Sequence, residues 1–299
     1  MKTSDYPGLF EASDLCAVSC ENKYFLLIKT RIAVLLVIAA VASFVWMEVP
    51  VAKTPAALVV AVSLVLSLSL GALLDKRRYD KSWFGCRALA ESVKVETWLF
   101  MTRTSPYDGT SDNADEEETF LQRLKQLLDR QQQTASDMAA HLKNTVQITD
   151  KMREIRGWNL GERRAYYSEN RIHDQLKWYT AKAQWNDRQG TRWSLISWGL
   201  QVFAVIVAVV IVGYGSLLFS PVGILTTASV GSLSWGQARN FRQLSESYGL
   251  VAQELSFHAD GIVRADDEGE FAEMVLQVER TISREHTMWL ARQIGTATV

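Results

Sequence analysis

Four long apolar runs dominate the pattern of hydrophobic and polar positions along the chain. None of them contains an Asp, Glu, Lys or Arg, and each approaches the roughly 20 residues that a helix needs to cross a bilayer core. The alternative is a buried hairpin in a soluble core, but such helices rarely lack charge on every face over this length. The pattern therefore predicts four transmembrane helices, at residues 32–47, 55–74, 194–214 and 216–235.

The four runs pair into two hairpins, because only a short turn separates the members of each pair. Lys and Arg gather where the chain enters and leaves each hairpin, whereas the first turn has one lysine offset by one glutamate and the second has no charge. The positive-inside rule then places the N-terminus, the segment between the hairpins and the C-terminus in the cytoplasm. We expect a multi-pass protein of the bacterial inner (plasma) membrane with cytoplasmic termini.

Outside the hairpins, the chain has helical periodicity and no strand signal. Predicted cytoplasmic helices cover residues 79–102, 116–152, 236–259 and 270–293. Both halves have the same order: a hairpin, a long helix, a polar break and a final amphipathic helix. This order indicates a tandem duplication, with one unit over 1–150 and a second over 151–299. The predicted fold is an all-α membrane protein with two two-pass transmembrane hairpins, long cytoplasmic helices and an internal tandem repeat.

Composition narrows the expected partners. The chain has 32 Lys and Arg against 33 Asp and Glu, a balance that argues against a nucleic-acid partner. Ten Trp is a high number, and Trp favours the interface between membrane and water. The lipid bilayer is therefore an expected partner, with candidate interfacial anchors at Trp46, Trp83, Trp193 and Trp235.

The three cysteines lack the spacing of a disulfide framework. Cys16 and Cys20 share a face of a predicted helix, but no further metal ligands stand nearby. We expect both, together with Cys86, to be packing thiols in a reducing compartment.

The sequence contains no constellation of catalytic, cofactor-binding or metal-binding residues. The four histidines are scattered, and no zinc-protease motif, nucleophile elbow, phosphate-binding loop or dinucleotide fingerprint occurs. The acidic runs 116–118 and 266–268 are typical of solvated surface. We expect a protein that is not an enzyme and that binds no cofactor or metal.

Small and polar residues line one face of the second and fourth runs, whereas the first and third are almost purely aliphatic. One interpretation is close helix packing, which Gly, Ser and Thr permit. The other is that these faces line a pore in an oligomer while the aliphatic helices face lipid. The absence of intramembrane charge argues against a proton-coupled transporter. The candidate face residues are Ser63, Ser67, Gly71, Gly223, Thr226, Thr227, Gly231 and Ser234.

Related residue patterns flank both hairpins. In the second half they are Trp178-Tyr179-x-x-Lys182-Ala183, Trp235-x-x-x-Arg239, Tyr248-x-x-x-Ala252-x-Glu254-Leu255 and Phe271…Val278-Glu279…Glu285-x-x-x-Trp289. In the first half they are Trp83-x-x-x-Arg87-x-x-Ala90-Glu91 and Trp98…Pro106-Tyr107. Together they resemble the SLATT family, two-transmembrane effector domains associated with bacterial nucleotide-second-messenger and SLOG-sensor systems. The chain looks like a tandem pair of SLATT units.

The resemblance implies a membrane effector that forms pores to kill or arrest an infected cell, an antiviral defence role. Family members often accompany a nucleotide-sensing or nucleotide-making partner, and we expect such a partner to be a separate protein. Because two hairpins are too few to enclose a wide pore, we expect a homo-oligomer that permeabilises or depolarises the inner membrane. The alternatives are a membrane-anchored scaffold or sensor that binds a cytoplasmic partner without forming a pore, and a constitutive small-ion channel.

Overall fold

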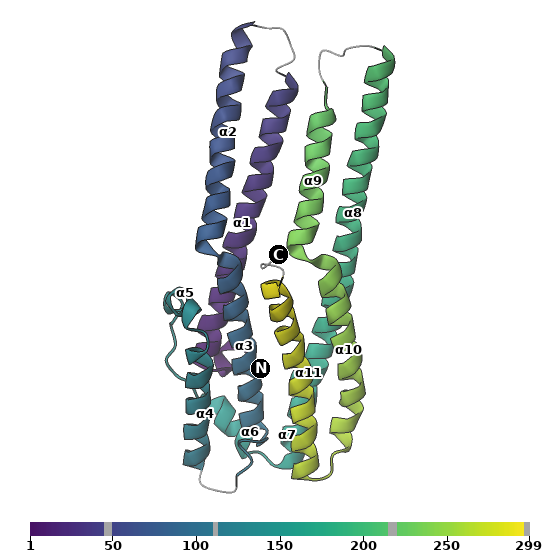
Figure 1. Cartoon of the computed structure of the whole chain (residues 1–299). Coiled ribbons are helices and arrows are strands. Elements are labelled where there is room, and N and C mark those ends of the chain that lie inside the picture. The colour runs from purple at the N-terminus through teal and green to yellow at the C-terminus, as the bar shows by residue number, and fades with distance from the viewer. Residues whose placement is uncertain (45–49, 110–112, 215–219, 296–299) are drawn as a thin grey trace. The chain divides into compact units, whose positions relative to one another are not determined.

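The structure, a computed structural model, describes residues 1–44, 50–109, 113–214 and 220–295. These residues form helices, turns and loops, and none of them is in a strand (Figure 1). The all-α prediction is therefore confirmed.

Two compact units make up the chain. Unit 1 consists of Met1–Glu21, Asp80–Ala183 and Glu246–Val299, and unit 2 consists of Asn22–Tyr79 and Gln184–Ser245. Each unit takes segments from both halves of the chain, so the two halves of the sequence repeat are not the two compact bodies. Unit 2 gathers the apolar spans of both hairpins, and unit 1 gathers the polar helices of both halves.

Unit 2 contains the apolar parts of four helices, α1 (Gly8–Phe44), α2 (Pro50–Arg77), α8 (Asp174–Tyr214) and α9 (Val222–Arg239). Three stretches are long and apolar enough to cross a membrane: Gly8–Ser43, Thr54–Met101 and Leu160–Gly213. The chain is thus an all-α membrane protein. The 18-residue helix α9 is not among these stretches, because it ends in polar residues. Residues 215–219, where the fourth span is predicted to begin, lie outside the described residues.

A left-handed residue follows the second helix of each hairpin. Arg78 has a φ of 46° and separates α2 from α3 (Tyr79–Met101). Asn240 has a φ of 51° and separates α9 from α10 (Phe241–Arg264). Asn tolerates this conformation better than most residues, whereas Arg adopts it uncommonly. A left-handed residue at corresponding points of both halves supports the duplication that the sequence indicates.

The remaining helices fall mainly in unit 1. They are η1 (Thr3–Asp5), α4 (Asn113–Asp129), η2 (Gln132–Thr134), α5 (Ala135–Ala139), α6 (Asp150–Gly157), α7 (Leu160–Tyr167), η3 (Ser168–His173) and α11 (Glu268–Gly295). Large aromatic side chains without solvent exposure form part of the core of this unit, including Trp98, Phe100, Tyr107, Phe120, Tyr167 and Phe271. Their burial supplies much of the driving force for folding unit 1.

The prediction of one helix over 116–152 is wrong. Helix α4 ends at Asp129, and residues 140–149 are not helical. Polar side chains there bond to nearby backbone instead of continuing the helix: the Thr134 hydroxyl donates to the Gln131 carbonyl at 2.9 Å, and the Asn144 side chain accepts from the Val146 amide at 2.9 Å. Thr, Ser and Asn compete with helical hydrogen bonds in this way.

The prediction that all three cysteines are packing thiols is wrong for two of them. A disulfide joins Cys16 of α1 to Cys86 of α3, and Cys20 is a buried free thiol. The bonded residues lie 70 positions apart in sequence, and their Cα atoms are 6.0 Å apart. The fold of unit 1 brings α1 and α3 together, a contact that spacing along the chain does not reveal.

Mass spectrometry after alkylation checks this disulfide. In the denatured chain we expect iodoacetamide to modify only Cys20 before reduction and all three cysteines after reduction. In a Cys86→Ser variant, Cys16 and Cys20 should both react without reductant. Modification of all three cysteines in the unreduced wild-type chain would contradict the pairing.

Candidate functional site

The two hairpins meet at the interface between α1 and α9 in unit 2. A groove of about 500 Å³ follows this interface, and we call it the hydroxyl groove. Apolar side chains of α1 line it together with small or hydroxyl-bearing residues in and just before α9. The lining residues are Leu35, Ile38, Ala39, Ala42 and Ser43 of α1, Gly223, Thr226 and Thr227 of α9, and Ser220, which precedes α9.

Small residues let α1 and α9 approach each other at both ends of the groove. A Cβ added to Gly231 would lie 2.9 Å from a methyl carbon of Ile32, and one added to Gly223 would lie 3.7 Å from the Ser43 hydroxyl. Close approach of this kind is how small residues drive helix association in membranes. A larger side chain at Gly231 would therefore force the two hairpins apart.

Two hydroxyl groups of the groove form hydrogen bonds within their own helices. Ser43 donates to the Ala39 carbonyl at 2.8 Å, and Thr226 donates to the Val222 carbonyl at 2.7 Å. Such back-bonding keeps these two hydroxyls paired when the groove is dry. Their oxygens keep lone pairs that can accept hydrogen bonds from water when the groove is wet. Ser43 and Thr226 thus lose no hydrogen bond in either condition.

A pair of buried serines joins α8 to α9. The Ser197 and Ser229 hydroxyls lie 2.9 Å apart, and each also donates to the carbonyl of the other residue, at 3.1 and 2.9 Å. Interhelical hydrogen bonds of this kind contribute about 0.6 kcal/mol each on average in a membrane. This pair fixes the second hairpin as a unit, and the predicted face residues do not include it.

The four spans of unit 2 lie in the order α2, α1, α9, α8 (Figure 1). A Cβ added to Gly71 of α2 would lie 3.8 Å from the Arg31 guanidinium of α1, which places the Ser67–Gly71 side of α2 toward α1. Ser67 is buried there, and Ser63 is half-buried. The α2 residues therefore line a contact inside the first hairpin and do not line the hydroxyl groove.

The predicted face residues of α9 lie in different surroundings. Gly223, Thr226 and Thr227 meet at the hydroxyl groove, and Gly231 lies at the close contact with α1. Ser234 is exposed. Ser43, which the groove also requires, is the one hydroxyl inside an otherwise aliphatic run. That isolation is the sequence signal that could have found it.

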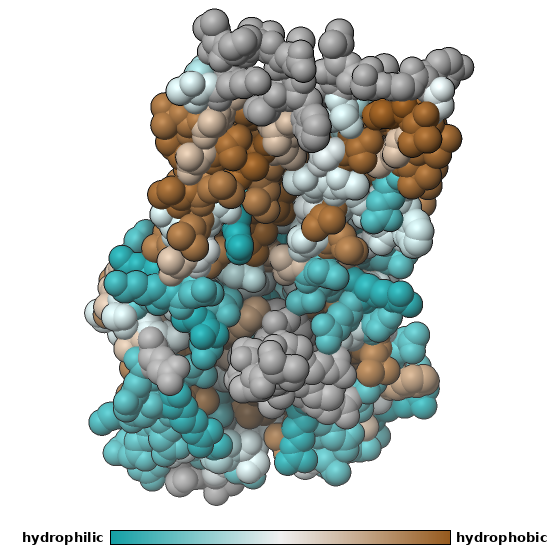
Figure 2. All heavy atoms as spheres, turned by 45° about the horizontal axis from the view of Figure 1, so that its top comes forward, coloured by the Kyte–Doolittle hydropathy of each residue, from teal (hydrophilic) through white to brown (hydrophobic). Residues whose placement is uncertain are grey.

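Of the two aliphatic helices, α1 is less exposed in unit 2 than α8. Helix α1 lies between α2 and α9, and its span is mostly half-buried. The larger exposed apolar surface of the first hairpin belongs to α2, with Leu58, Leu64, Val65 and Leu68 exposed. On α8, Leu195, Trp198, Val205, Val209 and Val212 are exposed as well. Figure 2 shows apolar surface of this kind in brown.

The predicted tryptophan anchors fall in different places. Trp193 and Trp235 lie together in unit 2, with ring centres 6.3 Å apart. Trp83 belongs to unit 1, where its ring lies 4.7 Å from that of Phe84. Trp46 lies outside the described residues.

Unit 1 contains a fully buried ion pair that the sequence analysis does not single out as a site. The Arg171 guanidinium of η3 donates to the Glu279 carboxylate of α11 through Nε at 2.8 Å and through a terminal nitrogen at 2.6 Å. The Tyr167 hydroxyl donates to the same carboxylate at 2.9 Å. Both side chains of the ion pair are 1% exposed. Both carboxylate oxygens of Glu279 therefore accept charge-assisted hydrogen bonds from Arg171 away from water.

Burial and charge set the pKa values in this network. Burial works to lower the pKa of the Arg171 guanidinium, but the facing Glu279 carboxylate outweighs burial and raises that pKa. Burial raises the pKa of the Tyr167 hydroxyl well above its usual range, and Glu279 adds to the effect. Arg171 thus stays charged and Tyr167 stays neutral near neutral pH.

A second charged cluster joins α1 to α3. The Glu91 carboxylate, which is nearly buried, pairs with Arg87 at 2.8 Å and with Lys94 at 3.4 Å. Arg87 also lies 3.6 Å from the Asp14 carboxylate. Arg87 and Glu91 belong to the first-half pattern that carries the family resemblance, and Glu279 belongs to the second-half pattern. In both halves, patterned charged residues thus help to hold helices of unit 1 together: Arg87 and Glu91 in the first and Glu279 in the second.

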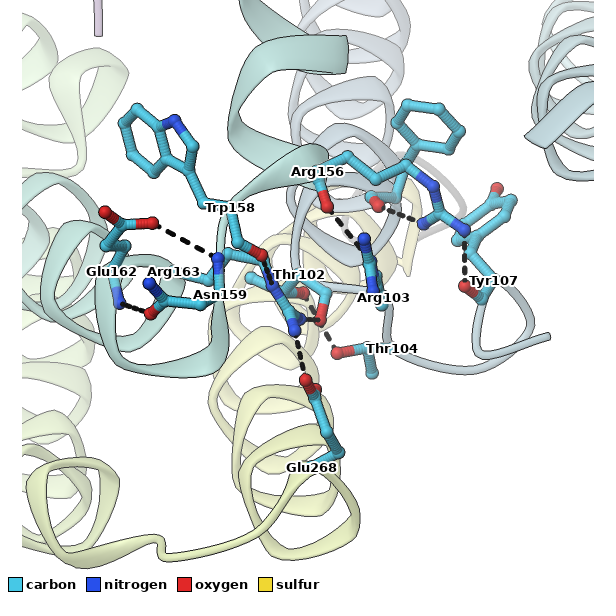
Figure 3. A network of polar contacts seen from close by, with 11 residues as sticks. Thr102, Arg103, Thr104, Tyr107, Arg156, Trp158, Asn159, Glu162, Arg163 and Glu268 are labelled. Atoms are coloured by element: carbon cyan, nitrogen blue, oxygen red, sulfur yellow. Dashed lines mark hydrogen bonds and ion pairs between the residues drawn. The ribbon is translucent and has the colours of Figure 1, made fainter. Parts of the chain in front are cut away.

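Arginines also fix the loop that follows α3 (Figure 3). Arg156 donates to the Phe100 carbonyl at 2.6 Å and to the Tyr107 carbonyl at 3.0 Å. Arg163, which is 1% exposed, donates to the Thr102 carbonyl at 2.8 Å and pairs with Glu268. The loop's carbonyl groups are thus satisfied by cations rather than by a strand or helix.

The prediction that both acidic runs are solvated surface is wrong for Glu116. Glu116 is 6% exposed and lies 3.9 Å from the Arg156 guanidinium. Glu268 is exposed but pairs with the buried Arg163. These arginines need nearby carboxylates because an unpaired buried charge is strongly destabilising. The runs therefore belong to the structure of the loop.

Among the described residues, no group of three or more His, Cys, Asp or Glu could hold a metal ion. The polar groups described above serve packing and ion pairing. The candidate functional site is therefore the hydroxyl groove of unit 2.

Comparison with protein families matches both halves of the chain. The family model described as SMODS and SLOG-associating 2TM effector domain 3 (SLATT_3) matches residues 7–164, and the model for domain 1 (SLATT_1) matches residues 167–289. No curated protein and no solved structure matches the chain significantly. The two family matches stand in tandem, as the repeat in the sequence predicts. The chain therefore belongs to the SLATT family of SMODS and SLOG-associating two-transmembrane effector domains, with two such domains in one polypeptide.

Proposed function

We propose that the chain is an effector that assembles with further copies in the bacterial inner membrane and permeabilises or depolarises it during antiviral defence. The family description, a two-transmembrane effector domain, supports the effector role for both halves. The observation that carries the permeabilising role is the hydroxyl groove. It places hydroxyl groups where the two hairpins meet, in spans that are otherwise apolar.

Opening would begin at the α1–α9 interface. Small residues, Gly223 and Gly231, make close contacts there, whereas hydrogen-bonded serines join α8 to α9. Separation of the hairpins therefore exposes the groove while each hairpin stays intact. Four spans enclose too narrow a space for a wide pore, so the exposed faces of several copies must combine.

A pore of this kind would discriminate weakly between ions. The groove is lined by hydroxyl groups and apolar side chains and carries no fixed charge. Selective channels concentrate charged or carbonyl rings in their narrow parts. An uncharged path of variable width would instead collapse the membrane potential, which suits an effector that arrests the cell.

The trigger in this proposal comes from a separate sensor or nucleotide-making protein that acts on unit 1. A non-pore scaffold and a constitutive small-ion channel are the competing functions. Expressing the chain with and without the genes that flank it, while a potential-sensitive dye reports the membrane potential, separates the three. The proposal predicts depolarisation only when the trigger system is active. Depolarisation under all conditions indicates a constitutive channel, and an unchanged potential under all conditions indicates a scaffold.

The proposed orientation predicts the behaviour of reporter fusions to the full chain. Because Lys and Arg flank the hairpins at the ends where the chain enters and leaves them, both termini should be cytoplasmic. Green fluorescent protein fused to either terminus should fluoresce, and alkaline phosphatase fused to the same terminus should be inactive. An active phosphatase at either terminus would refute this orientation.

A further inference from the structure

Two cations and several aromatic rings cluster around Trp235 in unit 2. The Lys29 ammonium lies 5.2 Å from the centre of the Trp235 ring, and the Arg239 guanidinium lies 5.9 Å from it. Arg239 also lies 4.3 Å from the centre of the Phe25 ring, which itself contacts Trp235 at 5.5 Å. Trp193 closes the cluster on the side of α8. Helices of both hairpins therefore build this site together.

The surroundings of the cluster are strongly basic. Unit 2 contains eleven Lys and Arg against three Asp and Glu. Ten of the eleven basic residues flank the spans at the end where the chain enters and leaves the hairpins, and Lys53 is the exception. Basic residues at this level of a membrane protein attract anionic lipid headgroups, at about 1 kcal/mol for each Lys or Arg near the surface.

The level of the cluster along the spans indicates where such a headgroup lies. Lys29 stands three residues before the first apolar run, and Trp235 is the last residue of the predicted fourth span. In a bilayer this is the depth of the lipid phosphates, where Trp rings also concentrate. Lys29 is exposed. A guanidinium stacked on a ring, as Arg239 is on Phe25, presents its N–H groups at its edge, the geometry that suits a phosphate.

We propose that Lys29, Arg239 and Trp235 form a binding site for the phosphate headgroup of an anionic phospholipid. The cations bind the phosphate oxygens, and the rings hold the cations at the depth of the headgroups. Because the site uses α1 of the first hairpin and α9 of the second, a bound lipid bridges the same interface that contains the hydroxyl groove. The inference requires membrane residence and does not depend on the proposed pore.

Thermal unfolding of the full chain in detergent tests the site. Dioleoyl phosphatidylglycerol should raise the unfolding temperature, whereas dioleoyl phosphatidylcholine and inorganic phosphate at equal concentration should not. Lys29→Gln with Arg239→Gln should lower the affinity for phosphatidylglycerol by roughly 30-fold, since each basic residue near an anionic surface contributes about a fivefold gain. The matched control, Lys125→Gln with Lys177→Gln, removes two exposed charges of unit 1 and should keep the full shift.

Three outcomes would overturn the proposal. An equal shift with phosphatidylcholine means that the chain binds lipid without regard to charge. An equal shift with inorganic phosphate means that the site takes a soluble anion. A full shift in the double variant means that phosphatidylglycerol binds elsewhere. If the double variant does not fold, Lys29→Gln alone serves, because Lys29 is exposed and should lose about fivefold in affinity.

Discussion

Replacing Glu279 by alanine lowers the free energy of unfolding of unit 1 by about 3–5 kcal/mol, the usual result of leaving one partner of a buried ion pair without the other. The Glu279 carboxylate accepts two hydrogen bonds from Arg171 and one from Tyr167. Without it, a fully buried guanidinium has no counter-charge. Thermal unfolding followed by tryptophan fluorescence in detergent measures the loss.

Two further variants serve as comparisons for Glu279→Ala. Arg171→Met combined with Glu279→Leu removes both charges and should recover much of the lost stability, because apolar residues often replace a buried pair without loss. Glu154→Ala breaks an exposed pair with Lys151 and should change stability by less than about 1 kcal/mol. A Glu279→Ala variant as stable as Glu154→Ala would show that the buried pair does not hold unit 1 together.

Replacing Thr227 by leucine should reduce ion flux through reconstituted protein more than tenfold while leaving the unfolding temperature nearly unchanged. Thr227 is half-buried on the groove side of α9, so leucine removes a hydroxyl and fills space in the groove without entering a packed core. Release of a trapped ion from liposomes measures the effect. Full flux in this variant would exclude the hydroxyl groove as part of the conducting path.

Two further substitutions in the membrane spans should respond differently from Thr227→Leu. Val212→Leu changes an 86% exposed residue of α8 and should leave both flux and stability as in the wild type. Ser67→Leu enlarges a buried residue where α2 faces α1 and should cost about 1–3 kcal/mol of stability through overpacking. A loss of flux in Ser67→Leu would therefore reflect altered packing, so Thr227 is the sharper test of the groove.

Much of the fold follows from the sequence because apolar run length is a direct signal. Charge-free stretches near 20 residues mark the spans, and the repeated order of hairpin and helices marks the duplication. The end of α4 at Asp129 is harder to predict. The polar residues after it suit a solvated helix and a chain bonded to its own side chains almost equally well, and contacts such as that between the Gly8 amide and the Val146 carbonyl decide between them.

The neighbours of each helix do not follow from the sequence. Composition shows that α1 is more aliphatic than α2, but it does not show that α1 lies between α2 and α9. The same limit applies to Cys16 and Cys86, which lie far apart in sequence, and to Glu116, which burial with Arg156 distinguishes from its solvated neighbours. Each of these outcomes depends on long-range packing that leaves no local pattern.

The candidate site was predictable in part for the same reason. Gly223, Thr226 and Thr227 share the groove because they share one face of α9, which helical spacing reveals. The small residues of α2 show equal spacing, yet they contact α1 inside the first hairpin. Spacing identifies a face, and only the fold shows what that face meets.

Release of a small dye from liposomes that contain the purified full chain tests the central claim most directly. We expect release once the trigger system is added, with a rate that rises more steeply than the first power of protein concentration because several copies must assemble. The Thr227→Leu variant should release little dye under the same conditions. Intact liposomes at every protein concentration, with the trigger system present, would contradict the claim that this chain permeabilises membranes.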